Sequence, residues 1–153
     1  RLEDGTWSAS ERIPGQTGDN VNPDVSLYGG YPAVAWTNIP ADSDLLPNVF
    51  FARKAGEGWL SPEKAIEDFG YQPDLGIGAD SGEVTVLGNW EASPLVEAAS
   101  KTVGGSWSVE EQLRYGNYTA HQELAVNAAG EALAVYLEDA DDGLYRIGAN
   151  SRD

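Results

Sequence analysis

The chain has 153 residues, enough for one domain with a buried core, and 41% of them are hydrophobic, which excludes a disordered chain. Its 25 acidic residues outnumber 9 lysines and arginines, and the net charge of −16 has the wrong sign for binding a phosphate backbone. No apolar run approaches the ~20 residues of a membrane helix. We therefore expect neither a nucleic-acid nor a membrane partner.

Strands are predicted, in chain order, at residues 7–13, 24–28, 32–37, 48–54 and 59–66, and then again in the same order. Val25 and Leu27 alternate with polar residues as a half-buried strand requires, and "NVFFARK" is rich in β-branched and aromatic residues. The alanine-rich segment 123–137 could form a helix on propensity. Its apolar residues are separated by two, so we predict a hairpin there and an all-β fold.

Four landmarks repeat along the chain in one register. Tryptophan recurs at spacings of 52 and 48 residues, as Trp7, Trp59 and Trp107. Each is followed four positions later by a glutamate: Glu11, Glu63 and Glu111. The others are a turn glycine, at Gly30, Gly82 and Gly130, and a carboxylate that opens an alternating apolar run, at Asp24, Asp74 and Glu123. A period of ~40–50 residues with several short strands predicts β-propeller blades of four antiparallel strands.

The repeat resembles the BNR or sialidase-type propeller repeat: an inner strand, a glycine turn, a strand ending in an aromatic, a return strand and a G-x-x-W turn. The Asp-box turn of that family has Ser or Thr, Asp, Gly and Trp at fixed spacing. Ser100, Gly104 and Trp107 match it, whereas Thr102 stands at the aspartate position. Before Trp59, Gly56 matches and Lys54 stands at that position. The resemblance implies a propeller fold and transfers no activity.

The predicted units are residues 14–66, 67–113 and 114–153, and the last of them lacks a fourth strand. Strand 7–13 precedes the first unit and has no unit of its own. Because propellers have about four to eight blades, three cannot close a ring. We therefore expect a homodimer with six blades in which strand 7–13 of each copy completes the last blade of the other. The alternative is a fragment of a longer propeller chain.

Loops on one rim of such a ring are candidates for ligand binding, since connecting segments carry function more often than the strands between them. They are residues 14–23, 37–47, 67–72, 88–93, 114–121 and 138–143. Aromatic and polar side chains there suit the faces and hydroxyls of sugars. The expected ligand-binding residues are Tyr71, Trp90, Tyr118 and His121. The repeated tryptophans Trp7, Trp59 and Trp107 are expected instead to pack between blades.

Asp24, Asp74 and Glu123 open the inner strands and are expected to surround the central channel. Carboxylates that lie so near one another raise one another's pKa or bind a cation, although such residues also cap turns. The acidic run Glu138–Gly143 lacks the spacing of a calcium loop, so we expect no metal site and no cofactor.

No nucleophile, zinc or phosphate-binding motif occurs, and only Arg114 falls clearly on the loop rim, where a sialidase needs three arginines. The sequence therefore favours a secreted, lectin-like, glycan-binding propeller with no catalytic residues assigned. Two alternatives remain open: a sialidase-like glycoside hydrolase fragment and a structural assembly module without a ligand. A protein from a saline environment is the alternative explanation of the charge.

Overall fold

The computed structural model describes residues 7–42, 44–68, 71–78, 80–89, 95–102, 104–115, 119–139, 142 and 144–152, with residues 71, 114–115 and 119–120 described by their backbone alone. These ranges contain twelve strands and no helix, and hence no helix that could cross a membrane. The predicted all-β class is confirmed.

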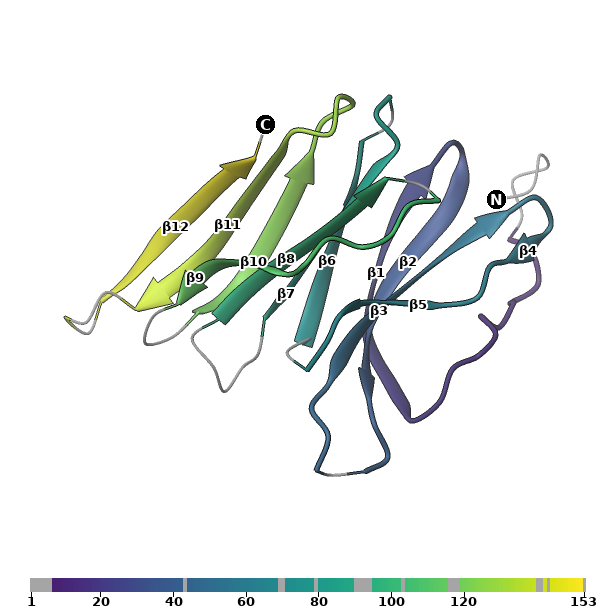
Figure 1. The fold of residues 1–153 in the computed structure, drawn as a ribbon, viewed down its shortest axis with the longest axis horizontal. Coiled ribbons are helices and arrows are strands. Elements are labelled where there is room, and N and C mark those ends of the chain that lie inside the picture. Colours follow the sequence, from purple (N-terminus) through teal and green to yellow (C-terminus); the bar gives the residue numbers. More distant parts are fainter. Residues whose placement is uncertain are drawn as a thin grey trace.

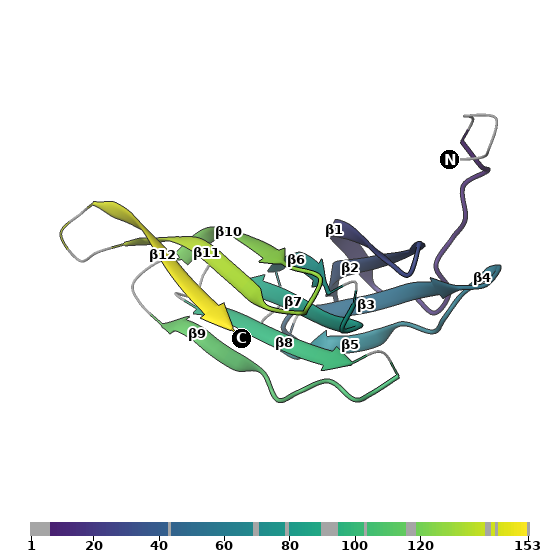
Figure 2. The same cartoon turned by 90° about the horizontal axis from the view of Figure 1, so that it is seen from above.

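The strands form three antiparallel sheets that lie side by side in chain order (Figure 1). The first sheet contains β1 (Asp19–Tyr28), β2 (Tyr31–Ile39), β3 (Asn48–Ala55), β4 (Gly58–Trp59) and β5 (Glu63–Ile66). The second sheet contains β6 (Tyr71–Ile77), β7 (Glu83–Asn89), β8 (Leu95–Thr102) and β9 (Glu111–Tyr115). The third sheet contains β10 (Thr119–Val126), β11 (Ala132–Asp139) and β12 (Tyr145–Arg152). Figure 2 shows the same sheets from above, with the N-terminal segment beside the first sheet.

The repeat seen in the sequence is also a repeat of strand register. Val25 pairs with Val34, Leu75 with Val86, and Leu124 with Ala134, and each second partner lies four residues after its turn glycine. The three glycines have φ of +82°, +66° and +98° at Gly30, Gly82 and Gly130, a conformation that glycine adopts without strain. The predicted hairpin in the alanine-rich segment is therefore correct.

Two predicted strands differ in the structure. The strand expected at 59–66 is divided into β4 and β5, and Pro62, which lies between them, has no N–H for a ladder hydrogen bond. The segment 7–13 contains no strand, because a strand needs a neighbour and nothing in the described chain pairs with it.

The core lies between the first two sheets. Ala33, Ala35 and Phe51 from the first sheet meet Leu75 and Val86 from the second, all at most 6% exposed. Trp107 packs edge-on against Phe51 with ring centroids 5.5 Å apart, so it packs between sheets as expected. Trp59 is only half-buried, and Trp7 is 87% exposed, so within the described residues the packing expected of these two tryptophans is partial for Trp59 and absent for Trp7.

The third sheet packs closely on the second at Gly76 in β6. A Cβ there would lie 2.1 Å from Val126 Cγ2 and 3.1 Å from Leu124 Cδ2. We expect Gly76→Ala to lower the free energy of unfolding by about 1–3 kcal/mol, because overpacking displaces these side chains. Urea melts would measure it, with Gly58→Ala in β4 as control, since no atom lies within 4 Å of a Cβ built there. Equal effects of the two substitutions would contradict this packing.

Candidate functional site

The three inner strands β1, β6 and β10 carry the same irregularity. Each has a β-bulge at the same place, between Val21 and Asp24, between Tyr71 and Asp74, and between Ala120 and Glu123. In all three strands the first residue of the bulge has a left-handed backbone conformation, with φ of 50° at Asn22, 43° at Gln72 and 51° at His121. A non-glycine residue in this region costs on the order of 1 kcal/mol, and such strain is concentrated at functional sites.

The bulges line one solvent-open hollow of about 380 Å³, which we call the inner-strand hollow. Three consecutive residues from each strand surround it: Asn22, Pro23, Asp24, Gln72, Pro73, Asp74, His121, Gln122 and Glu123. The lining is carboxylates, amides, an imidazole and two prolines. The structure thus brings the three predicted channel carboxylates to one place.

Two of these carboxylates hold neighbouring sheets in register. The Leu75 N–H donates a 2.7 Å hydrogen bond to Asp24 Oδ2, and the Leu124 N–H donates to Asp74 Oδ2. Each bond runs from one inner strand to the next, and it satisfies a backbone donor that its own sheet leaves free. Asp24 and Asp74 therefore have a structural role in the inner-strand hollow.

Asp74 is the most perturbed acid of the hollow. Its pKa is raised from 3.8 to about 7, mainly by burial and also by a hydrogen bond to the Asp24 side chain and the charges of Asp24 and Glu123, while the Leu124 N–H acts in the opposite direction. Because the two carboxyl groups are hydrogen-bonded, one of them must carry the shared proton. The hollow therefore holds an exchangeable proton near neutral pH.

Gln122 contributes a buried polar group to the same place. Its side chain is 8% exposed, and its Nε2 donates to the Gln72 carbonyl oxygen. Its Oε1 is buried and accepts no hydrogen bond from the described part of the chain. An acceptor of this kind costs about 1–3 kcal/mol unless water or a ligand donates to it.

The remaining predicted site residues are placed only in part. His121 lines the hollow, Tyr71 is described by its backbone alone, and Trp90 and Tyr118 lie outside the described residues. Tyr71 and His121 were expected on rim loops, but they lie in β6 and β10. Pairing resumes on the far side of each bulge, as with Tyr71 and Asn89, so the inner strands are longer than predicted and include these residues.

The amides of the hollow were not predicted. The signal was present in the triplets "NPD", "QPD" and "HQE", of which only the third residue of each and His121 were recognised as candidates. No group of three metal-ligating side chains with the geometry of a metal site occurs among the residues that the structure covers.

Comparisons with known proteins identify the fold. No protein-family model matches the sequence, and no curated protein matches it. Among solved structures, the Hadza microbial sialidase Hz136 superposes with a TM-score of 0.61 at 12% identity, over 88% of this chain. The chain spans 35% of that sialidase. The α-L-arabinofuranosidase PaAbf62A from Podospora anserina, solved in complex with cellotriose, covers 100% of this chain and 67% of its own at 12% identity, with a TM-score of 0.40. The likeness to the sialidase shows a β-propeller-type fold.

Proposed function

We propose that two copies of this chain form a six-bladed ring of BNR repeats and that the ring binds a glycan at the inner-strand hollow. The observation that carries the proposal is the threefold bulge, which gathers amide, carboxylate and imidazole groups into one hollow. Sugars present many hydroxyl groups, and side chains of these types exchange hydrogen bonds with them. The buried Gln122 Oε1 supplies an acceptor still free to receive a hydroxyl hydrogen.

The size of the hollow is consistent with this ligand class. Its volume of about 380 Å³ lies within the ~300–1,000 Å³ of small-molecule sites. The predicted aromatic residues Tyr71, Trp90 and Tyr118 remain candidates for stacking on a sugar face at its margin. A charge of −16 keeps such a module soluble outside the cell, so secretion is part of the proposal.

A glycan array, followed by titration calorimetry with the glycan it selects, tests this function. We expect His121→Ala to weaken binding about tenfold, as loss of one hydrogen-bonding contact does. Glu57→Ala, in the turn between β3 and β4, is the control and should leave the affinity unchanged. A silent array, or equal affinities for His121→Ala and the unmodified protein, would contradict glycan binding in this hollow.

Glycoside hydrolysis is the second candidate, and it rests on Asp74. A carboxyl group with a pKa of about 7 can act as a general acid at neutral pH. The Asp24–Asp74 pair alone is not the catalytic pair, since glycosidase carboxyl groups lie about 5–9.5 Å apart and these two are hydrogen-bonded. A panel of fluorogenic glycosides separates the candidates: turnover that Asp74→Asn abolishes supports the enzyme, binding without turnover supports the lectin, and neither supports a structural module.

A further inference from the structure

The outer edge of β12 is the one place where the repeat stops short within the described chain. In the first sheet β3 has β4 and β5 beyond it, and in the second sheet β8 has β9. The third sheet has the order β10-β11-β12, with no described strand beyond β12. The backbone groups on the outer edge of β12 are therefore available to pair with a further strand.

The register defines which residues are equivalent along this edge. Lys101 pairs with Val84 and Arg152 with Ala132, each two residues after a turn glycine. Counted in the same way on the first sheet, the equivalent residue is Lys54, which follows the Ala33–Arg53 pair. Lys54, Lys101 and Arg152 are therefore three copies of one position, and all three are basic.

The segment 7–13 already lies where the last strand of a preceding sheet would lie. Glu63 of the first sheet forms an ion pair with Lys101 of the second. Glu11 forms the same pair with Lys54 of the first sheet, at 2.7 Å. Since Glu11 and Glu63 occupy the same position after their tryptophans, residues 7–13 stand against the first sheet as β4 and β5 stand against the second.

The second sheet shows what the tryptophan of such a strand contacts. The Trp107 ring lies 5.3 Å from Lys101 Nζ and edge-on to Phe51 of the preceding sheet. The residue of the third sheet that is equivalent to Lys101 is Arg152. The residue of the second sheet that is equivalent to Phe51 is Ala98, because Leu87 pairs with Ala98 as Ala35 pairs with Phe51. A tryptophan completing the third sheet would therefore lie over Arg152 and toward Ala98.

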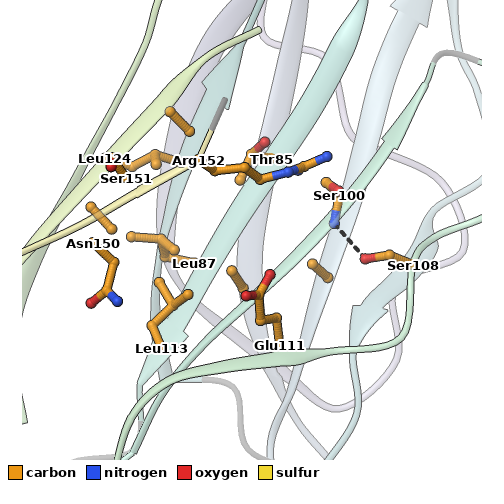
Figure 3. Close-up of a pocket in the computed structure, with 14 residues that line it drawn as sticks. Thr85, Leu87, Ser100, Ser108, Glu111, Leu113, Leu124, Asn150, Ser151 and Arg152 are labelled. Atoms are coloured by element: carbon orange, nitrogen blue, oxygen red, sulfur yellow. Dashed lines mark hydrogen bonds between the residues drawn. The ribbon is translucent and has the colours of Figure 1, made fainter.

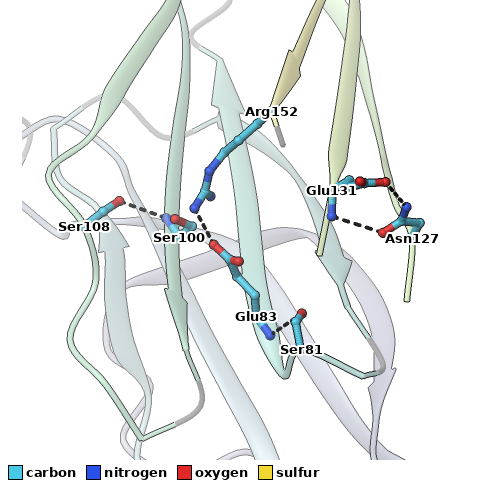
Figure 4. A network of polar contacts seen from close by, with 7 residues as sticks. All are labelled: Ser81, Glu83, Ser100, Ser108, Asn127, Glu131 and Arg152. Carbon is cyan, nitrogen blue, oxygen red and sulfur yellow. Dashed lines mark hydrogen bonds and ion pairs between the residues drawn. The ribbon is translucent and has the colours of Figure 1, made fainter. Parts of the chain in front are cut away.

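A hollow lies at that position, and we call it the edge hollow (Figure 3). It measures about 80 Å³ and is lined by, among others, Ala98, Ser100, Glu111, Leu113, Asn150 and Arg152. Alanine in place of phenylalanine leaves this space open. Arg152 now forms an ion pair with Glu83 at 2.5 Å (Figure 4), and its planar guanidinium can keep that carboxylate while stacking on an indole.

The two end faces of the chain point to the same occupant. Val25 and Leu27 on the first sheet are 65% and 66% exposed, whereas their equivalents Leu75 and Ile77 are 6% and 9% exposed. On the third sheet Leu133 is 46% exposed, whereas its equivalent Thr85 is 3% exposed. The ends thus expose the two faces that meet in the interior of the chain, so the third sheet of one copy fits the first sheet of another.

We propose that the edge of β12 and the edge hollow bind residues 7–13 of a second copy, with Trp7 over Arg152. This site rests on the two-copy ring of the proposed function and specifies its contacts. The Leu60 N–H donates to the Arg53 carbonyl and the Ser108 N–H to the Ser100 carbonyl, and the equivalent bond joins Ser8 of one copy to Ser151 of the other. Glu123, equivalent to Asp24 and Asp74, accepts in the dimer from the Val25 N–H of the second copy, a donor that in the single chain is bound to Asp24 Oδ1 at 2.8 Å.

A cysteine pair tests this register, and the chain contains no cysteine of its own. Ser8→Cys with Ser151→Cys should give a disulfide-linked dimer on mild oxidation, because directly paired strand residues have Cα atoms about 5.5 Å apart, within disulfide range. Ser10→Cys with Ser151→Cys is the control, displaced by two residues and out of reach. Absence of the covalent dimer in the first variant, or equal yields in both, would overturn the site.

Self-association gives the second measurement. Sedimentation of the full chain should show a dimer that Trp7→Ala weakens at least about thirtyfold, as removal of an interface anchor does. Leu45→Ala is the control, since Leu45 is also exposed, at 57%, but lies between β2 and β3. A monomer at all concentrations would overturn both the ring and the site. If the dimer is as stable with Trp7→Ala as without it, and the cysteine pair fails to cross-link, the site alone is overturned. Glycan binding is tested independently by the glycan array and calorimetry.

Discussion

Phe51→Ala is expected to lower the free energy of unfolding by about 3–5 kcal/mol, the range for truncating a buried phenylalanine. Phe51 is 2% exposed in the core between the first two sheets, and Trp107 packs edge-on against its ring. The substitution removes the aromatic contact and leaves a cavity that both sheets are too rigid to fill. Equilibrium urea unfolding, followed by tryptophan fluorescence, would measure the loss.

Phe50→Ala is the matched control for this prediction. Phe50 is the neighbouring residue of β3, half-buried on the opposite face, and stacks on Trp36 with ring centroids 6.1 Å apart. It should cost clearly less than Phe51→Ala, because part of its surface is already in water. If both variants lost the same stability, the core would not lie on the face that the structure assigns to it.

The sequence predicted those parts of the fold that depend on local signals. Alternation at Val25 and Leu27 and the turn glycines located the hairpins, because side-chain period and glycine conformation are properties of a few adjacent residues. The break between β4 and β5 was missed, although Pro62 marks it. The segment 7–13 was predicted as a strand from Trp7 and Glu11, but a strand also requires a partner, and none pairs with it in the described part of the chain.

The inner-strand hollow was predicted only in part, because its three carboxylates were expected together at a channel and His121 was expected separately on a rim loop. Asp24, Asp74 and Glu123 do meet in one hollow, as their common position in the repeat indicates. The bulges that turn Asn22, Gln72 and His121 into it depend on how each inner strand pairs with its neighbour, which alternation does not show. The capping of Leu75 and Leu124 likewise joins different sheets and has no local signal.

The stability of the protein should depend on pH through Asp74. Its pKa is about 7 in the folded chain against an ordinary value of 3.8, so between these values the folded state binds more protons than the unfolded state. Stability then decreases as pH rises from about 4 to about 7 and changes little above that through this group. Burial is the main cause, followed by the hydrogen bond to Asp24 and the charges of Asp24 and Glu123. Because Asp74 is only about half buried, solvent screening reduces the effect.

Asp74→Asn isolates this contribution from the other acids. Asparagine has the shape of the protonated aspartic acid, can still accept from the Leu124 N–H, and can donate to Asp24 as the shared proton does. Thermal unfolding from pH 4 to pH 8 should therefore show a smaller loss of stability in Asp74→Asn than in the unmodified protein, with the two closest at pH 4. Asp44→Asn, in the loop between β2 and β3, should follow the unmodified profile. Burial also raises the pKa of Glu97, which contributes to the dependence of stability on pH in the same direction. The contribution of Asp74 is therefore the difference between the Asp74→Asn profile and that of the unmodified protein. Parallel profiles for Asp74→Asn and the unmodified protein would mean that Asp74 is ionised throughout this range, and the shared proton in the inner-strand hollow would have to be abandoned.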